Sequence, residues 1–244
     1  GLMNNTITHG DLNQNAVFNF CPHQSDKIDF FKLWSRNKEM ELSAIRRNYF
    51  SFIFQSTNLF GSLTAEQNVG LPAILEGVSE EDTFNKTHKI FNNILKDVDF
   101  SENDIRITEL SGGQRQRLAF SRAIISDFSV LFADEPTGNL DYYNASLVMQ
   151  SLVDYVSHNN DDNNRTVIIV THDIDLALRF ATKIVFINRV DVVDDNKTVS
   201  SGQINSETVF VKAKSGWCLQ NGDSKFSNKD FYHYLRNKFD PHKE

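Results

Sequence analysis

The stretch ELSGGQRQRLAFSRAIISDFSVLFADEPTGNLD, Glu109–Asp141, decides the fold of this 244-residue chain. In its first half Ser111 is followed three positions later by Gln114, which is typical of a capping box at the start of a helix. In its second half an apolar run ends in two carboxylates, those of Asp134 and Glu135. The stretch therefore predicts a helix that begins near the serine and a strand that ends at the carboxylates.

The composition is that of a folded domain and argues against several classes of protein. Hydrophobic residues make up 40% of the chain and charged residues 23%, an ordinary globular balance. Acidic residues outnumber basic ones by 32 to 25, which disfavours a general nucleic-acid binder. Cys21 and Cys218 lack metal-ligand spacing and are expected to be reduced thiols of a cytosolic protein. No apolar run approaches the roughly 18 residues of a membrane span, and no signal peptide is expected.

Strands and helices are expected to alternate around the opening stretch. The run over 49–55 is β-branched and aromatic and ends in a polar residue, which predicts a strand. The runs over 129–135 and 165–173 are continuously apolar and end in polar residues, which is typical of parallel strands buried on both faces. A helix over 144–158 joins the last two runs into a βαβ unit. Further elements are expected as helices over 63–75, 82–98, 173–181 and 228–239, a strand over 183–187 and β structure over 190–212.

Two of these helices have additional local signals. Thr64 and Gln67 form a second capping box at the start of 63–75, and Pro72 is expected to interrupt or kink that helix. In the helix over 82–98 the apolar residues recur with helical period, which predicts a buried face. That face is expected to consist of Phe84, Ile90, Phe91, Ile94 and Leu95.

Two motifs within the opening stretch carry chemistry. The carboxyl end of a strand is where ligands bind in open α/β sheets, so Asp134 suits Mg²⁺ and Glu135 suits the activation of a water molecule. At the helix start, Gly112 and Gly113 expose backbone N–H groups to an anion, and Ser111 adds a hydroxyl. Taken singly, each motif is also compatible with plain structure, as two acids that end a strand and as a glycine turn with a good N-cap.

The spacing of further motifs makes the pattern specific. Asp134 lies 23 positions after Ser111. The histidine of THD, His172, ends the next apolar run 37 positions after Glu135. Gln55 ends a strand 56 positions before Ser111. Together these motifs indicate one composite site, because each polar residue follows an apolar strand.

This combination resembles the nucleotide-binding domain of ATP-binding-cassette (ABC) proteins, over residues from about 46 to 187. The resemblance implies an α/β fold of the P-loop NTPase-like (RecA-like) kind, with a mostly parallel sheet, an inserted α-helical subdomain and an incomplete N-terminal part. It divides the chain into an N-terminal β/core region with an insertion and the Q-loop, a helical subdomain, a RecA-like core and a C-terminal extension, over residues 1–60, 61–110, 111–190 and 191–244.

The resemblance also assigns roles to individual residues. The signature sequence, which in the family contacts the γ-phosphate of ATP held by the opposite subunit, corresponds to Ser111, Gly112, Gly113 and Gln114. Asp134 corresponds to the Walker B aspartate that holds Mg²⁺, and Glu135 to the catalytic glutamate. Gln55 corresponds to the Q-loop glutamine, which contacts Mg²⁺ and the attacking water. Asp141 corresponds to the D-loop aspartate of the ATP site, and His172 to the switch histidine that hydrogen-bonds the γ-phosphate.

Two stretches are similar to one subgroup of the family, that of lipoprotein release, macrolide export and cell division. They are EPTGNLD and, over 45–72, IRRNYFSFIFQSTNLFGSLTAEQNVGLP. The resemblance implies an ATPase that uses ATP and Mg²⁺ and powers export or mechanotransmission. Its partners would be an integral-membrane permease and a second ABC subunit, at the cytoplasmic face of the plasma membrane and without nucleic acid. The transported substrate is not specified, because specificity lies in the permease.

One family motif is absent from these residues. None of the 11 glycines leads into G-x-x-x-x-G-K-[ST], the Walker A loop. The opening GLMNNTITHG, residues 1–10, resembles the turn that follows the Walker A helix, and residues 11–43 are interpreted as an insertion. A partial sequence, a degenerate subunit that completes a partner's ATP site, and a rearranged gene or other lysine source remain as alternatives. Without the loop, the chain alone is expected to be inactive.

Overall fold

The structure is a computed structural model in two compact units, Gly1–Val170 and Thr171–Glu244. Each unit is described by itself. The residues that the structure describes are 19–22, 27–100, 105–138, 140–158, 165–194, 197–222 and 224–239. The turn expected at residues 1–10 and part of the expected insertion lie outside them, and the division into four domains stays a prediction.

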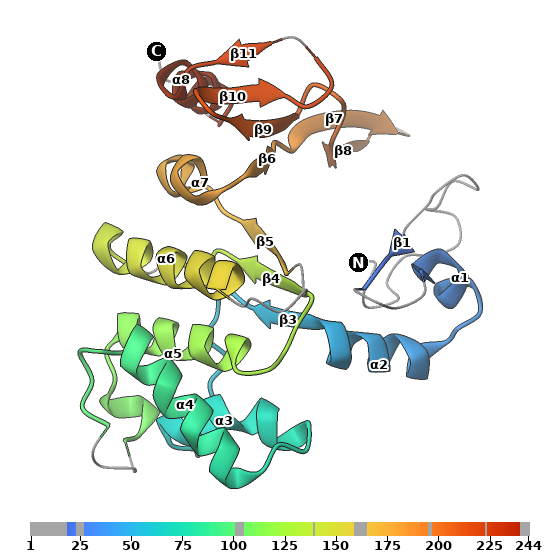
Figure 1. Cartoon of the computed structure of the whole chain (residues 1–244). Coiled ribbons are helices and arrows are strands. Elements are labelled where there is room, and N and C mark those ends of the chain that lie inside the picture. The colour runs from blue at the N-terminus through green and yellow to red at the C-terminus, as the bar shows by residue number, and fades with distance from the viewer. Residues whose placement is uncertain are drawn as a thin grey trace. The chain divides into compact units, whose positions relative to one another are not determined.

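The first unit consists of helices around one parallel sheet (Figure 1). A short β-ribbon and a further helix precede them in the chain. In order, the elements are β1 (Asn19–Phe20), β2 (Ile28–Asp29), α1 (Phe30–Ser35), α2 (Glu39–Tyr49), β3 (Phe50–Ile53), α3 (Ala65–Leu75), α4 (Glu80–Ile94), α5 (Gly112–Ile124), β4 (Val130–Asp134), α6 (Tyr142–His158) and β5 (Thr166–Val170).

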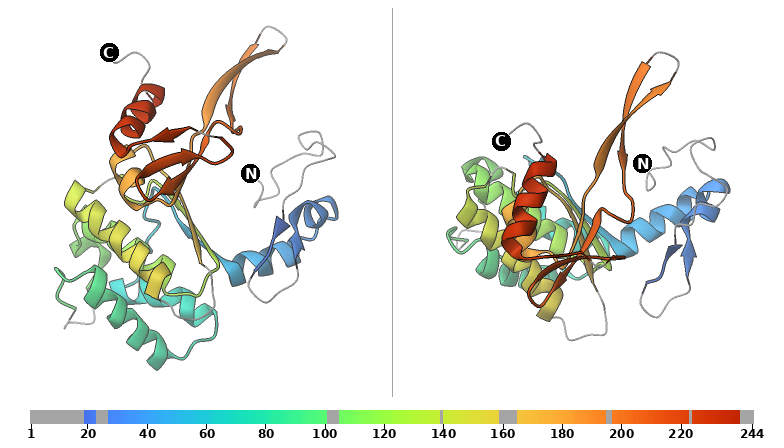
Figure 2. Two further views of the ribbon diagram at one scale, coloured as in Figure 1. Left: turned by 45° about the horizontal axis from the view of Figure 1, so that its top comes forward. Right: turned by 90° about the horizontal axis from the view of Figure 1, so that it is seen from above.

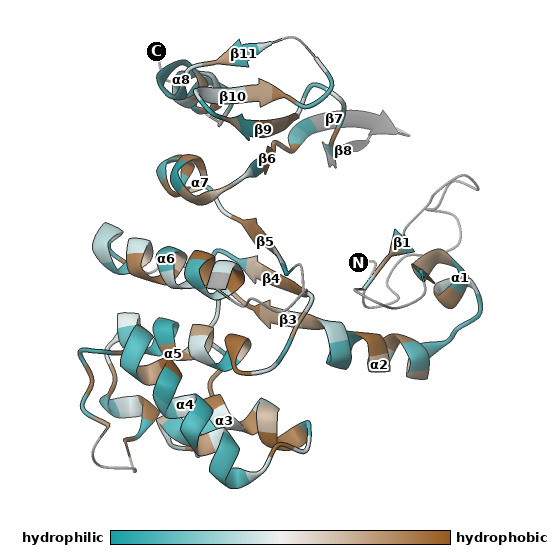
Figure 3. Ribbon diagram, in the orientation of Figure 1, coloured by the Kyte–Doolittle hydropathy of each residue, from teal (hydrophilic) through white to brown (hydrophobic). Residues whose placement is uncertain are grey.

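The parallel sheet has the order β3-β4-β5, so β4 is paired on both edges. Its register aligns Phe52 with Phe132, and Phe132 with Ile168. The three strands are the apolar runs that the sequence predicts, and β4, α6 and β5 form the expected βαβ unit. Because the strands are parallel, their carboxyl ends lie at one edge of the sheet. The apolar character of all three strands is visible in Figure 3.

One face of this sheet is covered by helices. Leu131 and Ala133 of β4 belong to a buried cluster that also contains Leu118 of α5 and Val148 of α6. Helices α3, α4, α5 and α6 supply most of the remaining members. Burial of this face holds the carboxyl end of β4 rigidly in the unit, because most of the cluster is shielded from water.

The other face is covered by aromatic residues from the N-terminal elements. Phe30 is fully buried, with its ring centroid 6.2 Å from that of Phe50 and 5.7 Å from that of Trp34. The rings of Phe52 and Phe132 stack with centroids 5.5 Å apart. This cluster explains why a short and polar N-terminal region contains closely spaced aromatic residues.

The prediction that the run over 165–173 forms a strand buried on both faces is wrong for β5. Ile168 and Val170 are 46% and 56% exposed. In the described part of the chain, the N-terminal aromatic cluster packs on β3 and β4, and no residue of β5 belongs to it. The apolar run of β5 therefore predicts the strand correctly but not the burial of its second face.

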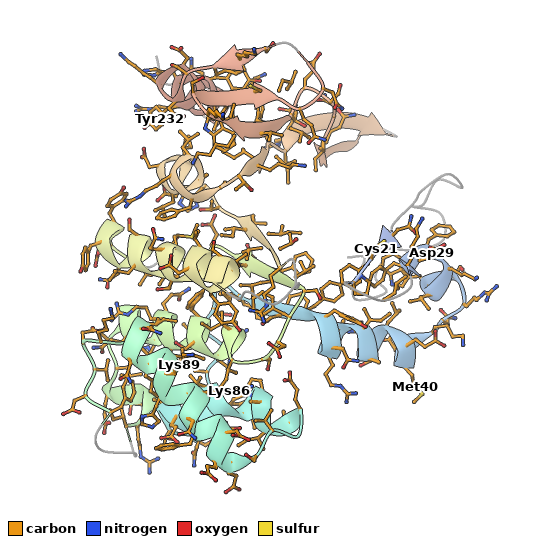
Figure 4. All side chains as sticks on the ribbon, viewed as in Figure 1. Cys21, Asp29, Met40, Lys86, Lys89 and Tyr232 are labelled. Carbon is orange, nitrogen blue, oxygen red and sulfur yellow. The ribbon has the colours of Figure 1, made fainter. Side chains whose placement is uncertain are left out.

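The helices α3 and α4 confirm most of their local signals. Thr64 and Gln67 form both hydrogen bonds of the capping box. The expected interruption at Pro72 is wrong, because α3 continues past it to Leu75. On α4, Phe91, Ile94 and Leu95 are buried and Ile90 is partly buried, as the helical period predicts. The expectation for Phe84 is wrong, since its side chain is 41% exposed and its ring lies against His88, with centroids 4.1 Å apart. Lys86 and Lys89 lie on the exposed side of α4 (Figure 4).

The loop between β3 and α3 is fixed by two side chains. Asn68 is fully buried; its Oδ1 accepts from Phe60 N at 2.8 Å and its Nδ2 donates to the carbonyl of Thr64 at 2.9 Å. Arg122 of α5 donates to the carbonyls of Thr57 and Asn58, at 3.1 and 2.7 Å. The chain that leaves β3 therefore has a defined path.

The second unit is built on an antiparallel sheet of order β11-β10-β9-β6. Strands β7 and β8 form a separate long hairpin (Figure 2), and Phe210, Trp217, Phe231 and Leu235 form a buried core. The elements are α7 (Ile174–Phe180), β6 (Lys183–Val185), β7 (Asn188–Asp194), β8 (Lys197–Gln203), β9 (Val209–Ala213), β10 (Gly216–Leu219), β11 (Lys225–Phe226) and α8 (Asn228–Phe239). The expected helices, the strand and the β structure are all confirmed here.

Replacing Asn68 by Ala is expected to lower the free energy of unfolding by about 2–3 kcal/mol, because it removes the hydrogen bonds between this buried amide and the backbone of the loop. Urea denaturation would measure the loss. Asn93→Ala on the exposed side of α4 is the matched control and is expected to stay within about 0.5 kcal/mol of the parent chain. Equal effects of the two substitutions would contradict this account of the loop.

Candidate functional site

The candidate site begins at the carboxyl end of β4. Asp134 is the last residue of the strand and is exposed. Glu135 follows with a φ of +46°, a left-handed conformation that is uncommon for a residue other than glycine. Its backbone N–H donates to the carbonyl of Val170 at 2.9 Å, and its carbonyl accepts from Gly138 N at 3.2 Å. These bonds fix the direction in which the glutamate leaves the sheet, and strained residues of this kind concentrate at functional sites.

The turn that follows Glu135 packs on helix α5. The side chain of Gln116 is buried, and its Nε2 donates to the carbonyl of Pro136 at 2.9 Å. A Cβ atom placed on Gly113 would lie 3.3 Å from Cδ2 of Leu140. The structure therefore brings the start of α5 and the turn after Glu135 together, although the sequence separates them by about one strand and one helix.

The start of α5 has the capping box that the sequence predicts. Ser111 Oγ accepts from Gln114 N at 3.2 Å, and Gln114 Oε1 accepts from Ser111 N at 2.8 Å. A Cβ atom on Gly112 would meet nothing within 4 Å. The first turn of this helix is thus ordered and open on one side, which suits an approach by an anion.

Gln55 and His172 complete the set of predicted site residues. Gln55 lies two residues beyond the end of β3 and is exposed, so it leaves the sheet at the same edge as Asp134. His172 is also exposed, but it belongs to the second unit, and its role stays a prediction. The structure thus places Gln55, Asp134 and Glu135 at one edge of the sheet.

Asp141 immediately precedes helix α6 and is connected to α5 through hydrogen-bonded side chains. Its Oδ1 and Oδ2 accept from the backbone N and Nδ2 of Asn144, at 2.9 and 2.6 Å. Arg117 donates to Oδ1 of the same asparagine. The Nη2 atom of this arginine also donates to both carboxylate oxygens of Asp97, at 2.6 Å each.

This chain of contacts affects two carboxyl groups. The backbone and side-chain hydrogen bonds from Asn144 hold the pKa of Asp141 below its usual value. Burial tends to raise the pKa of Asp97, but the hydrogen bonds and charge of Arg117 and a bond from Gln114 outweigh it, so this pKa is also lowered. Both groups are therefore held in the charged form.

The oxygen donors at this edge of the sheet suit Mg²⁺, which keeps part of its water shell, better than a metal ion that is bound by protein side chains alone. Among the residues that the structure describes, no group of three His, Cys, Asp or Glu side chains could hold a metal ion. Magnesium usually keeps several waters and binds through one or two carboxylates together with substrate phosphates. An exposed carboxylate at Asp134, with an amide at Gln55 on the same edge, matches this requirement.

A sequence model of the ABC transporter family matches residues 15–138. Similar curated proteins include the macrolide export ATP-binding/permease protein MacB of Neisseria meningitidis, 36% identical over 179 residues, and that of Escherichia coli, 34% identical over 178 residues. In each case the alignment covers 72% of this chain and 26% of the relative. The chain thus spans about a quarter of the length of these relatives.

A solved structure is similar in fold as well as in sequence. It is the dimeric structure of a post-hydrolysis state of an ATP-binding cassette bound to ADP and Pi, with a TM-score of 0.52 and 34% identity. The match covers 60% of this chain and 62% of the cassette. It supports the α/β fold of P-loop NTPase type that the motifs imply. In the described ranges, no helix is both long enough and apolar enough to cross a membrane.

Sequence reasoning missed several residues that position the site. Asp97 lies outside the motifs and Asn144 lies three positions after Asp141, and the sequence does not pair either of them with Arg117. A signal did exist, because Arg117 directly precedes the apolar residues of α5, and a charged residue that is buried with them needs a partner. The identity of that partner depends on tertiary packing, which the sequence pattern does not contain.

Replacing Asp97 by Asn is expected to lower the free energy of unfolding at pH 7 by about 1–2 kcal/mol, between the values of an exposed and a buried ion pair. Asp97 is half exposed and its partner is buried, with exposed fractions of 56% and 4%. Because the folded-state pKa is lowered, this stability is present above the unfolded value of about 3.9 and is lost as the pH falls through the folded-state value. The difference between the two proteins should therefore disappear at acid pH.

Urea denaturation between pH 3 and pH 7 would measure this difference. Asp127→Asn offers a matched control, because the exposed carboxylate of Asp127 also forms an ion pair with a buried arginine side chain, that of Arg165, at 2.9 Å. A difference between parent and Asp97→Asn that stays constant across the pH range would contradict the assignment.

Proposed function

This chain belongs to the ABC transporter family, and we propose that it is the ATP-binding and ATP-hydrolysing part of a transporter of the export or mechanotransmission type. The observation that carries the proposal is the carboxylate pair at the end of β4, on a turn that packs against the open start of α5. Hydrolysis of the terminal phosphoanhydride bond of ATP needs such neighbouring elements, a metal ligand and a water-directing group on one side and hydrogen-bond donors to the phosphate on the other.

Each residue of the sheet edge has a distinct role in this proposal. Glu135 accepts a proton from, or orients, the attacking water, and its fixed backbone limits where the carboxylate reaches. Asp134 holds Mg²⁺, with Gln55 as a further ligand and as a contact for the water. The metal supplies charge stabilisation to the phosphate oxygens when it is bound.

The signature residues are proposed to face a nucleotide held by a second subunit. Ser111, Gly112, Gly113 and Gln114 offer backbone N–H groups and a hydroxyl to the terminal phosphate. Asp141 completes the same site from the turn that packs on Gly113. His172 is proposed to donate a hydrogen bond to the γ-phosphate. The dimeric arrangement of the similar cassette supports a two-subunit site.

The names of the relatives support an export function and a membrane partner. MacB is an ATP-binding/permease protein for macrolide export, and we propose that this chain likewise works with an integral-membrane permease, at the cytoplasmic face of the membrane. The 244 residues alone are proposed to be inactive, because they contain no Walker A loop to hold the nucleotide.

The test is the ATPase activity of the complete gene product with its permease. Glu135→Gln is expected to lower kcat by about 10²–10⁴-fold, the usual contribution of a general base, while ATP binding is retained. Glu81→Gln on the exposed start of α4 is the matched control and should leave kcat unchanged. Normal turnover of Glu135→Gln would remove Glu135 from this role, and turnover by the 244 residues alone would refute their proposed inactivity.

A further inference from the structure

The guanidinium of Arg117 lies inside the first unit and depends on few partners. Its side chain is 4% exposed. Nη2 donates to both oxygens of Asp97 and Nη1 donates to Asn144. Among the described residues, Nε has no hydrogen-bond partner. A buried cation is stable only while its partners stay in place, so the position of this group depends strongly on the carboxylate of Asp97.

The orientation of the Asn144 amide follows from that of the guanidinium. A side-chain amide has one acceptor oxygen and one donor nitrogen. Because Arg117 donates to the oxygen, the nitrogen is left to face Asp141, to which it donates at 2.6 Å. If the guanidinium turned away, the amide would lose one of the two contacts, to Arg117 and to Asp141, that hold it in this orientation.

The same carboxylate of Asp97 also contacts the signature sequence. Oδ2 accepts from Nε2 of Gln114 at 3.3 Å, while Oε1 of that glutamine accepts from Ser111 N at 2.8 Å. Asp97 therefore adds a second contact that favours the same orientation of the glutamine amide as the bond from Ser111 N. One exposed carboxylate, in the loop after α4, contacts or directs both segments proposed to bind ATP.

We propose that Asp97 is a positioning residue that holds Asp141 and the signature sequence in fixed positions relative to each other. It acts on Asp141 through Arg117 and Asn144, and on the signature sequence through Gln114. The relevance of these relative positions to ATP rests on the proposed function. The positions themselves are a property of the first unit and can be measured without nucleotide.

The experiment is hydrogen exchange on the 244-residue chain, followed by NMR at two backbone amides. The amide of Asn144 reports on the Asp141 side chain, and that of Ser111 reports on the Gln114 side chain, because each donates to that group. Asp97→Asn is expected to speed exchange at both amides by about tenfold through local opening. The amide of Ala133, inside the central strand, should change much less.

Asp127→Asn is the matched control, since it weakens a similar ion pair to the buried Arg165 elsewhere in the unit. It is expected to leave the Asn144 and Ser111 amides unchanged. Asp97→Glu keeps the charge and should retain protection at both. The proposal is overturned if Asp97→Asn changes neither amide, if it changes Ala133 equally, or if Asp127→Asn or Asp97→Glu reproduces its effect.

A second variant decides the matter if Asp97→Asn does not fold. Asn144→Ala removes the middle of the chain at a partly buried helix start, while its backbone N–H remains. It should speed exchange at position 144 but not at Ser111, and the opposite pattern or no change would overturn the proposal. Failure of the proposed function would appear separately, as normal ATP turnover in Glu135→Gln with these exchange results unaffected.

Discussion

The pairing of β4 on both edges is the constraint on which the rest of the first unit depends. Hydrogen bonding to parallel strands on either side determines where β4 ends along the strand direction. Helices pack on one face of the strand and aromatic rings on the other, and this packing fixes its orientation. The carboxylates of Asp134 and Glu135 therefore leave the sheet at a defined point. The turn beyond them, the start of α5 and the path of the chain after Gln55 are then arranged around that point by hydrogen bonds and packing.

Features set by neighbouring residues could be predicted from the sequence. The capping box at Ser111 and Gln114 needs only a serine, a glutamine and their spacing, and the strand before Asp134 needs only an apolar run. The grouping of polar residues at the sheet edge could also be predicted, because parallel strands bring their carboxyl ends together. The position of His172 relative to that edge was not, since it follows from the arrangement of two units.

Features set by distant residues could not be predicted. The exposure of Ile168 and Val170 depends on how far the N-terminal aromatic rings extend across the sheet, and no local pattern encodes that reach. The partnership of Asp97 with Arg117 depends on the packing of the loop after α4 against α5. In both cases the residue types were informative, but the identity of the neighbour came from tertiary structure.

The backbone of Glu135 has a further consequence. At a φ of +46° glycine would be less strained than glutamate, because the left-handed conformation costs an L-residue about 1–2 kcal/mol. Selection for thermal stability alone would therefore favour loss of the carboxylate at this position. Under the proposed function, this local cost in stability is offset by the carboxylate that the position supplies to the site.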